Sequence, residues 1–356
     1  MAGDAPTSPI ATLTSSASDA DGRRQPSLKS LPGWAEDDHR AAFRAFRKSA
    51  ERLGAEDTSS PDTLPGLKAA AGAALRLQAD LSSAEACSFF ETFFALAPSA
   101  AEGLLTGYYE PVIEARSRLS EAFGVPIYRP PEEAVQIELT DRPPLCPDRA
   151  AIEAGALAGR GLELAYVADP VDLFFIHVQG SARLSLGDGR HMRIGFAGKS
   201  GHAYTSIGRL AVERGYLAKD AAGKAGLEHW LKAHREAGRR LMAENRSFIF
   251  FEEIVDLASD DGPLGAARVP LSAGRSLAVD PRFAAFHLPV FVSAPPLPGF
   301  GPGPFCRLMV AQDVGSAIKG AGRADIFAGS GEDAGKAAGD IRHRGVLRLL
   351  LPKANA

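Results

Sequence analysis

Residues 308–320 read LMVAQDVGSAIKG, a short apolar run that reaches one aspartate and is broken at once by a glycine. Asp and Gly are common turn residues, so one interpretation of Asp313 is a turn at the end of a strand. Two more glycine-flanked aspartates follow, Asp325 in ADIFAGSG and Asp340 in AGDIRHRG. The segment therefore contains either three separate turns or one site to which three acids contribute.

Length and charge favour a protein of about two domains and exclude some partners. The chain has 356 residues, whereas single domains cluster near 100 to 150 residues. With 40 Lys and Arg against 43 Asp and Glu, the net charge of −3 provides no basic field for nucleic acid. The longest apolar runs, such as VDLFFIHV and SFIFFEEIV, fall well short of the roughly 20 residues that span a bilayer. We expect no nucleic-acid partner and no transmembrane segment.

The cysteines and histidines indicate no metal site. Cys87, Cys146 and Cys306 are far apart, odd in number and without a C-x-x-C pattern, although one pair would be able to bridge in an oxidising compartment. The histidines lack the spacing of metal ligands. We therefore expect no metal and no cofactor. Residues 1–30 are rich in Ser, Ala, Asp and Thr and have no apolar core, so they are predicted to form a disordered leader in which no export signal is visible.

The order of periodic segments predicts helices, then strands, then helices and strands again. Phe43, Phe46 and Leu53 recur at helical spacing, and SSAEACSFFETFFAL (82–96) opens with the Ser-x-x-Glu pattern of a capping box. From residue 103 to about 195 the chain is mostly strand-like, ending in two runs that flank Asp188 and Gly189, a hairpin signal. Helical patterns follow at 204–215 and 225–245, and the proline-rich 293–305 is predicted to be a loop.

Seven ordered pieces of sequence together resemble the MltA-type lytic murein transglycosylases, which carry a C-terminal "3D" domain named for three aspartates. The resemblance runs from about Leu31 to Leu351. Its pieces are TGYYEP (106–111), PIYRPP (126–131), VQGSARLSLGDG (178–189), AGKSGHAYTSIGR (197–209), NRSFIFFEE (245–253), VPLSAGRSLAVDP (269–281) and the aspartate segment.

The resemblance implies a mainly β fold with helices. Residues 31–111 and 246–356 would form a double-psi β-barrel catalytic domain, with the 3D segment at about 269–351. Residues 112–245 would form an inserted small β-barrel domain with flanking helices. A substrate groove is expected between the two domains.

The resemblance also implies a reaction. Enzymes of this family cut the β-1,4 bond between N-acetylmuramic acid and N-acetylglucosamine in peptidoglycan and leave 1,6-anhydromuramic acid ends. Asp313 falls on the family's catalytic aspartate, which would act first as general acid and then as base. Asp325 and Asp340 fall on the other signature aspartates and are expected to support it.

A general acid must keep its proton near neutral pH, and free Asp has a pKa of about 3.9. We expect burial beside the apolar run 308–310 and repulsion from Asp325 or Asp340 to raise the pKa of Asp313. If GSAIKG began a helix, its N-terminus would lower that pKa instead.

Two other motifs are candidates for sugar binding. In TGYYEP, one tyrosine is expected to be core and the other to stack on a sugar ring. In VQGS, the polar groups suit either hydrogen bonds to a sugar or a bent strand. The candidate substrate-binding residues are Thr106, Gly107, Tyr108, Tyr109, Gln179, Gly180 and Ser181.

Two alternatives to a transglycosylase stay open. One is an inverting glycan hydrolase on the same fold, with Asp325 or Asp340 as the base. The other is a non-catalytic peptidoglycan-binding module. In each case the expected partners are peptidoglycan glycan strands, with cell-wall synthesis or remodelling proteins as further candidates. The expected location is the bacterial periplasm, with association to the outer membrane as an extension of that expectation.

Overall fold

The computed structural model describes residues 27–55, 64–134, 146–219, 223–258 and 260–353. These residues fall into two compact units. Unit 1 contains the chain up to Tyr108, Leu264–Gly329, and the chain from Asp340 onward, and unit 2 contains Tyr109–Pro263 and Ser330–Gly339. Of the predicted leader, residues 1–26 lie outside the described residues, and Leu28–Ser30 forms a short 3-10 helix, η1.

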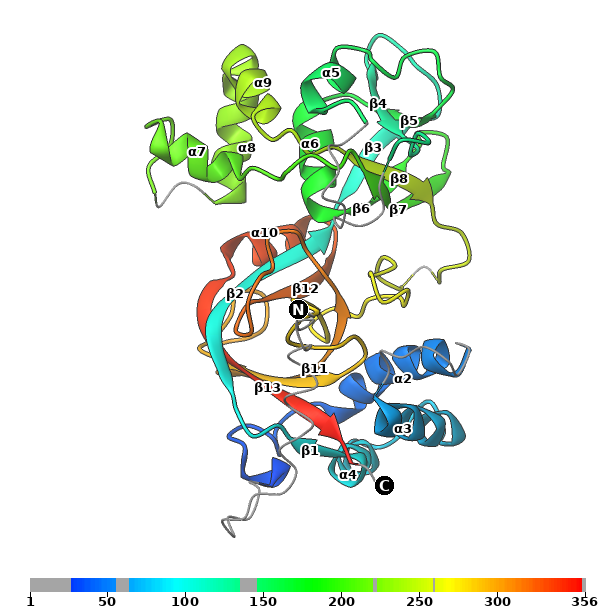
Figure 1. Ribbon diagram of the computed structural model, residues 1–356, viewed down its shortest axis with the longest axis vertical. Helices are drawn as coiled ribbons and strands as arrows, with labels where there is room; N and C mark the ends of the chain where they lie inside the picture. Colours follow the sequence, from blue (N-terminus) through cyan, green and yellow to red (C-terminus); the bar gives the residue numbers. More distant parts are fainter. Residues whose placement is uncertain (1–26, 56–63, 135–145, 220–222, 259, 354–356) are drawn as a thin grey trace, which may run out of the picture. The chain divides into compact units, whose positions relative to one another are not determined.

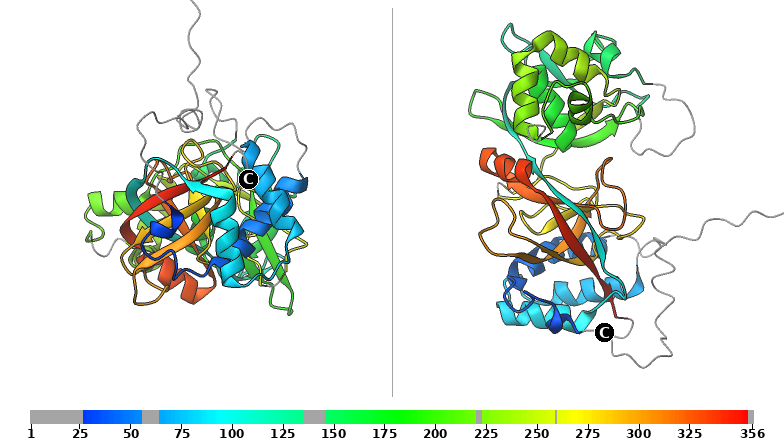
Figure 2. Two further views of the ribbon diagram at one scale, coloured as in Figure 1. Left: turned by 90° about the horizontal axis from the view of Figure 1, so that it is seen from below. Right: turned by 90° about the vertical axis from the view of Figure 1, so that its left-hand side faces the viewer.

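Unit 1 is built on a seven-stranded sheet that closes on itself. The strands, in their order across the sheet, are β1 (Phe94–Leu96), β13 (Arg342–Pro352), β10 (Pro289–Ala294), β11 (Phe305–Asp313), β9 (Ser276–Val279), β12 (Ala324–Ser330) and β2 (Ala101–Glu110). β2 also pairs with β13, which closes all strands except β1 into a barrel. The long strands β2 and β13 run side by side in both Figure 1 and Figure 2.

The alternation of side chains along the strands builds two cores. Leu277, Met309 and Ala311 belong to the core inside the barrel. Leu308 and Val310 alternate with them and belong to a second core outside it. Strand β11 is therefore buried on both faces, which explains why its sequence is a continuous apolar run rather than an alternating one.

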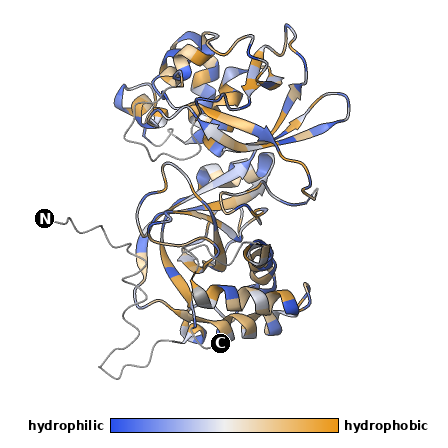
Figure 3. Ribbon diagram, turned by 45° about the vertical axis from the view of Figure 1, so that its right-hand side comes forward, coloured by the Kyte–Doolittle hydropathy of each residue, from blue (hydrophilic) through white to orange (hydrophobic). Residues whose placement is uncertain are grey.

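The outer core of unit 1 is covered by three helices, α2 (His39–Ala55), α3 (Pro65–Arg76) and α4 (Ser83–Phe93). Phe43 and Phe46 of α2 are fully buried, as their spacing predicts. The capping box of α4 is also confirmed, because Ser82 accepts from Glu85 N while the Glu85 side chain accepts from Ser82 N. Figure 3 shows hydrophilic and hydrophobic residues mixed along these helices, as burial of one face requires.

Unit 2 contains a six-stranded sheet and most of the remaining helices. Its strands, in order across the sheet, are β4 (Val125–Tyr128), β5 (Glu163–Val167), β3 (Val112–Arg116), β6 (Ser181–Ser185), β7 (His191–Lys199) and β8 (Ile249–Glu253). Its helices are α5 (Arg149–Glu153), α6 (Pro170–Gln179), α7 (Ile207–Glu213), α8 (Lys224–Ala233), α9 (Arg235–Ala243) and α10 (Glu332–Asp340), whose last residue belongs to unit 1. Side chains from the two outermost strands, Tyr128 and Phe250, share one core cluster, so the sheet curls.

One prediction for unit 2 is wrong. The run VDLFFIHVQ, expected to be strand-like, is helix α6, and His177 lies on it. The helix is buried on nearly all sides, so its residues show no polar face, and periodicity alone does not separate such a helix from a buried strand. Its end signals were present in the sequence: Asp169 caps the N-terminus, Pro170 opens the first turn, and Gly180 ends the helix with φ 78°.

Other expectations are confirmed. Strands β6 and β7 form the hairpin around Asp188 and Gly189, and the loop between β10 and β11 takes up the proline-rich stretch. The fold class, a β-rich chain with helices and a closed barrel, is also confirmed. Cys87, Cys146 and Cys306 are free thiols. Among the described residues, no helix is both long and apolar enough to cross a membrane.

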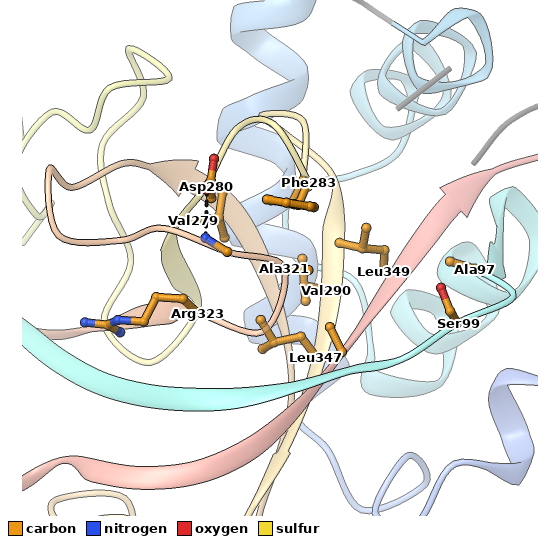
Figure 4. A pocket seen from close by; sticks show the side chains of 13 residues that line it. Ala97, Ser99, Val279, Asp280, Phe283, Val290, Ala321, Arg323, Leu347 and Leu349 are labelled. Carbon is orange, nitrogen blue, oxygen red and sulfur yellow. Dashed lines mark hydrogen bonds between the residues drawn. The ribbon is translucent and has the colours of Figure 1, made fainter. Parts of the chain in front are cut away.

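A pocket of about 380 Å³ opens among residues of the barrel in unit 1. Val279, Val290 and Leu347 supply apolar walls (Figure 4). The buried carboxylate of Asp280 lies at its edge, where it accepts from Gly320 N at 2.7 Å. The guanidinium of Arg323 points away from the pocket in Figure 4. Neither Asp313 nor Asp325 lines this pocket.

Candidate active site

Asp313 is the last residue of β11, and a β-bulge decides which face of the sheet it occupies. Ala311 lies opposite Leu277 of β9, but Asp313 lies opposite Ala278, so Gln312 is an extra residue in the pairing. In an unbroken strand, Asp313 would share the face of Ala311, which points into the barrel core. The bulge moves Asp313 to the opposite face.

The same register brings Asp325 to this face. Asp325 of β12 lies opposite Ala278 from the other side of β9, so the two aspartates flank one alanine. Two strand spacings separate their backbones by about 9 to 10 Å. Asp313 and Asp325 are thus brought together by strand pairing, as the sequence-based hypothesis of one site requires.

Three donors hold the carboxylate of Asp313. The backbone N–H groups of Ala266 and Val314 both donate to Oδ1, each at 2.9 Å. The hydroxyl of Tyr108 donates to Oδ2 at 2.8 Å. Each carboxylate oxygen is therefore fixed in direction, and the carboxylate has little freedom to rotate.

Burial nevertheless determines the direction of the pKa shift at Asp313. Loss of solvent around the carboxyl raises its pKa above the ordinary value, and the hydrogen bonds from Ala266, Tyr108 and Val314 only oppose this shift. The residues that follow Asp313 form turns rather than a helix, so the dipole effect considered for GSAIKG does not arise. The environment shifts Asp313 toward its protonated form relative to a free aspartic acid.

Asp325 has a different environment. Thr106 donates its hydroxyl to Asp325 Oδ1 at 2.6 Å, and Arg323 donates to the same hydroxyl at 2.8 Å. Burial raises the pKa of Asp325 to about 6, against the lowering effects of Thr106 and Arg323, and the charge of Asp313 adds to the rise. The repulsion that was expected to raise the pKa of Asp313 is not among the causes of its shift, and it raises the pKa of Asp325 instead.

The two tyrosines of TGYYEP have separate surroundings. The Tyr108 ring packs on Phe327 with 5.4 Å between ring centroids, and burial raises the pKa of its phenol well above normal, so it stays a donor. Tyr109 is only 8 % exposed, and its N–H donates to Gln179 Oε1 at 3.0 Å. Tyr109 is the core member of the pair, and Tyr108 lies beside the acid.

The remaining candidates lie in less distinctive places. Gly107 lies in β2 between Thr106 and Tyr108, half-buried. Gly180 is the left-handed end of helix α6, and Ser181 is buried at the start of β6. In the part of the chain that the structure describes, the NH₂ group of Gln179 makes no hydrogen bond, so its carboxamide keeps free donors. The role of these four residues in sugar binding stays a prediction.

Asp340 is exposed at the end of α10. Across the described ranges, no hydrogen bond or ion pair joins it to Asp313 or Asp325, and its supporting role stays a prediction. The same ranges contain no group of three or more His, Cys, Asp or Glu placed to hold a metal ion.

Three contributors to the site were not found from the sequence. The donors of Ala266 and Val314 are backbone groups, which leave no signal in side-chain type. Arg323 precedes Asp325 by two residues, a spacing that puts both on one side of an extended segment and that would have indicated it.

Comparison with known proteins gives consistent matches in sequence and in structure. Residues 104–252 match the MltA specific insert domain, and residues 275–351 match the 3D domain. The curated membrane-bound lytic murein transglycosylase A of Escherichia coli K12 is 39% identical over 251 residues, covering 69% of this chain. The match spans 64% of that relative's length, which is less than two thirds.

Solved structures resemble nearly the whole chain. A membrane-bound lytic murein transglycosylase from Agrobacterium tumefaciens superposes with a TM-score of 0.82 at 38% identity, over 92% of this chain and 97% of that one. The structure of E. coli MltA with bound chitohexaose gives a TM-score of 0.66 at 32% identity, over 86% of this chain and 90% of that one.

Proposed function

Since this chain belongs to the MltA family of lytic murein transglycosylases, we propose that it cleaves the β-1,4 bond between N-acetylmuramic acid and N-acetylglucosamine in peptidoglycan, leaving 1,6-anhydromuramic acid ends. The observation that carries the proposal is the environment of Asp313, a carboxyl with a raised pKa that is held by three donors. The chitohexaose bound by the E. coli relative supports a β-1,4-linked amino-sugar chain as the ligand class.

The donors around Asp313 support an assignment of the acid proton. Oδ1 already accepts two backbone N–H groups, whereas Oδ2 accepts only the Tyr108 hydroxyl. The proton of the neutral acid would therefore sit on Oδ2, whose second lone pair is available. Tyr108 would orient that oxygen and remain un-ionised throughout.

In the first step, Asp313 gives its proton to the glycosidic oxygen that leaves with N-acetylglucosamine, as the C1–O4 bond breaks. In the second, the C6 hydroxyl of the muramic acid forms the O6–C1 bond and passes its proton to the Asp313 carboxylate. The acid is thereby regenerated without water. Because the nucleophile is part of the substrate, its effective concentration is high and no second carboxylate is needed as a base.

An inverting hydrolase on the same fold is the second candidate, because Asp325 lies on the same face of the barrel wall. Its base would have to activate a water at the longer carboxyl separation of about 6.5 to 9.5 Å. Asp325 accepts from Thr106 and lies near Arg323, an arrangement that suits a supporting residue better than a base facing a water.

The mass of the products distinguishes these functions. Purified sacculi are digested, and the muropeptides are separated and weighed. We expect reducing ends lighter by one water than the hydrolysed form, as a 1,6-anhydro ring requires. Ends that carry the additional water would favour the hydrolase instead. Protein that sediments with sacculi but releases nothing between pH 4 and 8 would favour a binding module.

We also propose that the protein acts in the periplasm, where its substrate lies, with association to the outer membrane and contact with cell-wall synthesis or remodelling proteins as further expectations. The names of the relatives, which describe membrane-bound enzymes, support this. Fractionation of cells that express the natural gene tests it, and protein found only in the cytosol would contradict it.

A further inference from the structure

Gln312 is a polar side chain that is completely buried between the barrel and helix α2. Its Nε2 donates to the carbonyl oxygen of Ala45 at 2.9 Å and to Ser49 Oγ at 2.8 Å. Its Oε1 accepts from Ser276 Oγ at 2.5 Å. The carboxamide is therefore bonded to both the helix and the neighbouring strand, and its position is tightly defined.

Gln312 is also the extra residue of the bulge that sets the face of Asp313. With unbroken pairing, Gln312 would lie opposite Ala278 and Asp313 opposite Val279, whose side chain is in the barrel core. In either register Gln312 lies on the face of Leu308 and Val310, beneath α2, so its bonds to Ala45 and Ser49 fix the strand immediately before Asp313. These bonds hold the strand at the residue beyond which the bulge moves Asp313 to the other face.

The backbone of Gln312 holds a second part of the site, the turn 265–268. The Gln312 carbonyl accepts from Ala267 N at 3.0 Å, and the adjacent N–H of Ala266 donates to Asp313 Oδ1. Gly265 lies so close that a Cβ there would be 2.5 Å from the Gln312 oxygen. The position of Gln312 therefore fixes both the turn and Asp313.

We propose that Gln312 is the positioning residue for Asp313, and that helix α2, through Ala45 and Ser49, is part of the catalytic apparatus. This inference rests on the proposed function. It extends the site to a helix that lies outside both matched family domains, which cover 104–252 and 275–351. For stability alone, an apolar side chain would suit this buried position better than an amide, which must find a partner for each polar atom.

The test compares three variants of the full chain. Gln312→Met keeps the length of the side chain and removes its hydrogen bonds. Ser49→Ala removes a single partner. Val310→Ala is the matched control, because Val310 precedes Gln312 on the same strand, packs in the core beneath α2, and takes no part in the bulge.

Each variant is assayed for kcat and KM on sacculi, for thermal stability, and for the pKa of Asp313 by ¹³C NMR titration of the aspartate carboxyls. The Asp313→Asn protein identifies the Asp313 signal. The titration needs no substrate.

We expect Gln312→Met to lower kcat by about 10- to 100-fold, the scale of a catalytic group displaced by about 1 Å, with KM within about threefold of wild type. The pKa of Asp313 should rise further, because a shift of the Gln312 backbone would move the Ala266 N–H away from a carboxyl that stays buried. Ser49→Ala should do the same to a smaller degree, about three- to tenfold in kcat. Val310→Ala should melt earlier with unchanged kcat and pKa.

The inference is overturned if Gln312→Met and Ser49→Ala behave like Val310→Ala. In that case they would lose stability, while kcat stays within twofold of wild type and the pKa of Asp313 within about 0.3 unit. If Gln312→Met does not fold, Ser49→Ala decides by the same criteria. A wild-type protein that forms no anhydro product would refute the proposed function, whereas the titration would still decide whether Gln312 positions Asp313.

Discussion

Removal of the Tyr108 hydroxyl should shift the pH dependence of the reaction in a known direction. That hydroxyl donates to Asp313 Oδ2 at 2.8 Å, and Tyr108→Phe keeps the ring against Phe327 while deleting the donor. The bond favours the carboxylate, so its loss raises the pKa of Asp313 beyond the value that burial already produces.

The size of the shift follows from the strength of such a bond. A hydrogen bond to a charged group is worth about 1.5 to 3 kcal/mol, and one pKa unit corresponds to about 1.4 kcal/mol. A neutral carboxyl retains part of the bond, so we expect the lower end, a rise of about 1 unit. Because the first step needs the protonated acid, the descending limb of kcat against pH should move about 1 unit to higher pH.

The assay measures initial rates of release from sacculi between pH 4 and 9 for wild type, Tyr108→Phe and Tyr128→Phe. Tyr128 is a buried tyrosine of unit 2, so its variant controls for the loss of a phenol elsewhere. The reasoning is refuted if the limb of Tyr108→Phe moves by less than about 0.3 unit or moves to lower pH, or if Tyr128→Phe gives the same displacement.

Four further substitutions, one of them a control, test the energetics of the fold. The pKa of Asp325 is raised to about 6, so its ionisation destabilises the folded state as pH rises from about 4 to 6. The free energy of unfolding of Asp325→Asn should therefore increase by about 2 to 3 kcal/mol relative to wild type between pH 4 and 7. Urea unfolding at each pH measures this. In Gly103→Ala, the new Cβ would lie 2.2 Å from the backbone oxygen of Gly322, so we expect severe loss of folded protein, whereas Gly124→Ala, with its nearest atom at 3.9 Å, should stay folded. Glu110 is buried and accepts from Arg183 and Ser330, so Glu110→Ala should cost about 3 kcal/mol in denaturant unfolding, and a cost under about 1 kcal/mol would show that the pair contributes little.

Local features of the fold were predictable where a sequence pattern has one structural solution. Phe43 and Phe46 recur at helical spacing among charged residues, and both are buried on one face of α2. Helix α6 was not predictable from periodicity, because burial on nearly all sides removes the polar residues that would reveal a helical period. The closed barrel was expected only from the family resemblance, since strand order depends on partners far apart in the chain.

Of the three acids predicted for the candidate site, the structure brings Asp313 and Asp325 to one face and leaves Asp340 apart from them, and the geometry of the site was not predictable. Asp313 and Asp325 stand out because glycine-flanked acids in one short segment are conspicuous. The bulge at Gln312 is invisible in the sequence, because it exists only relative to strand β9, more than thirty residues earlier. The N–H of Ala266 is likewise a backbone group that tertiary contact brings to Asp313, and no residue type predicts it.

The most direct test of the central claim, that Asp313 performs the acid and base steps, is the turnover of Asp313→Asn on sacculi. The amide keeps the shape of the carboxyl and removes its proton, so we expect a loss of about a hundredfold to ten-thousandfold. Circular dichroism should show a folded protein that melts at the same or a slightly higher temperature at neutral pH, since a carboxyl with a raised pKa destabilises the fold there. A folded Asp313→Asn protein that retains more than about a tenth of wild-type turnover would contradict the claim.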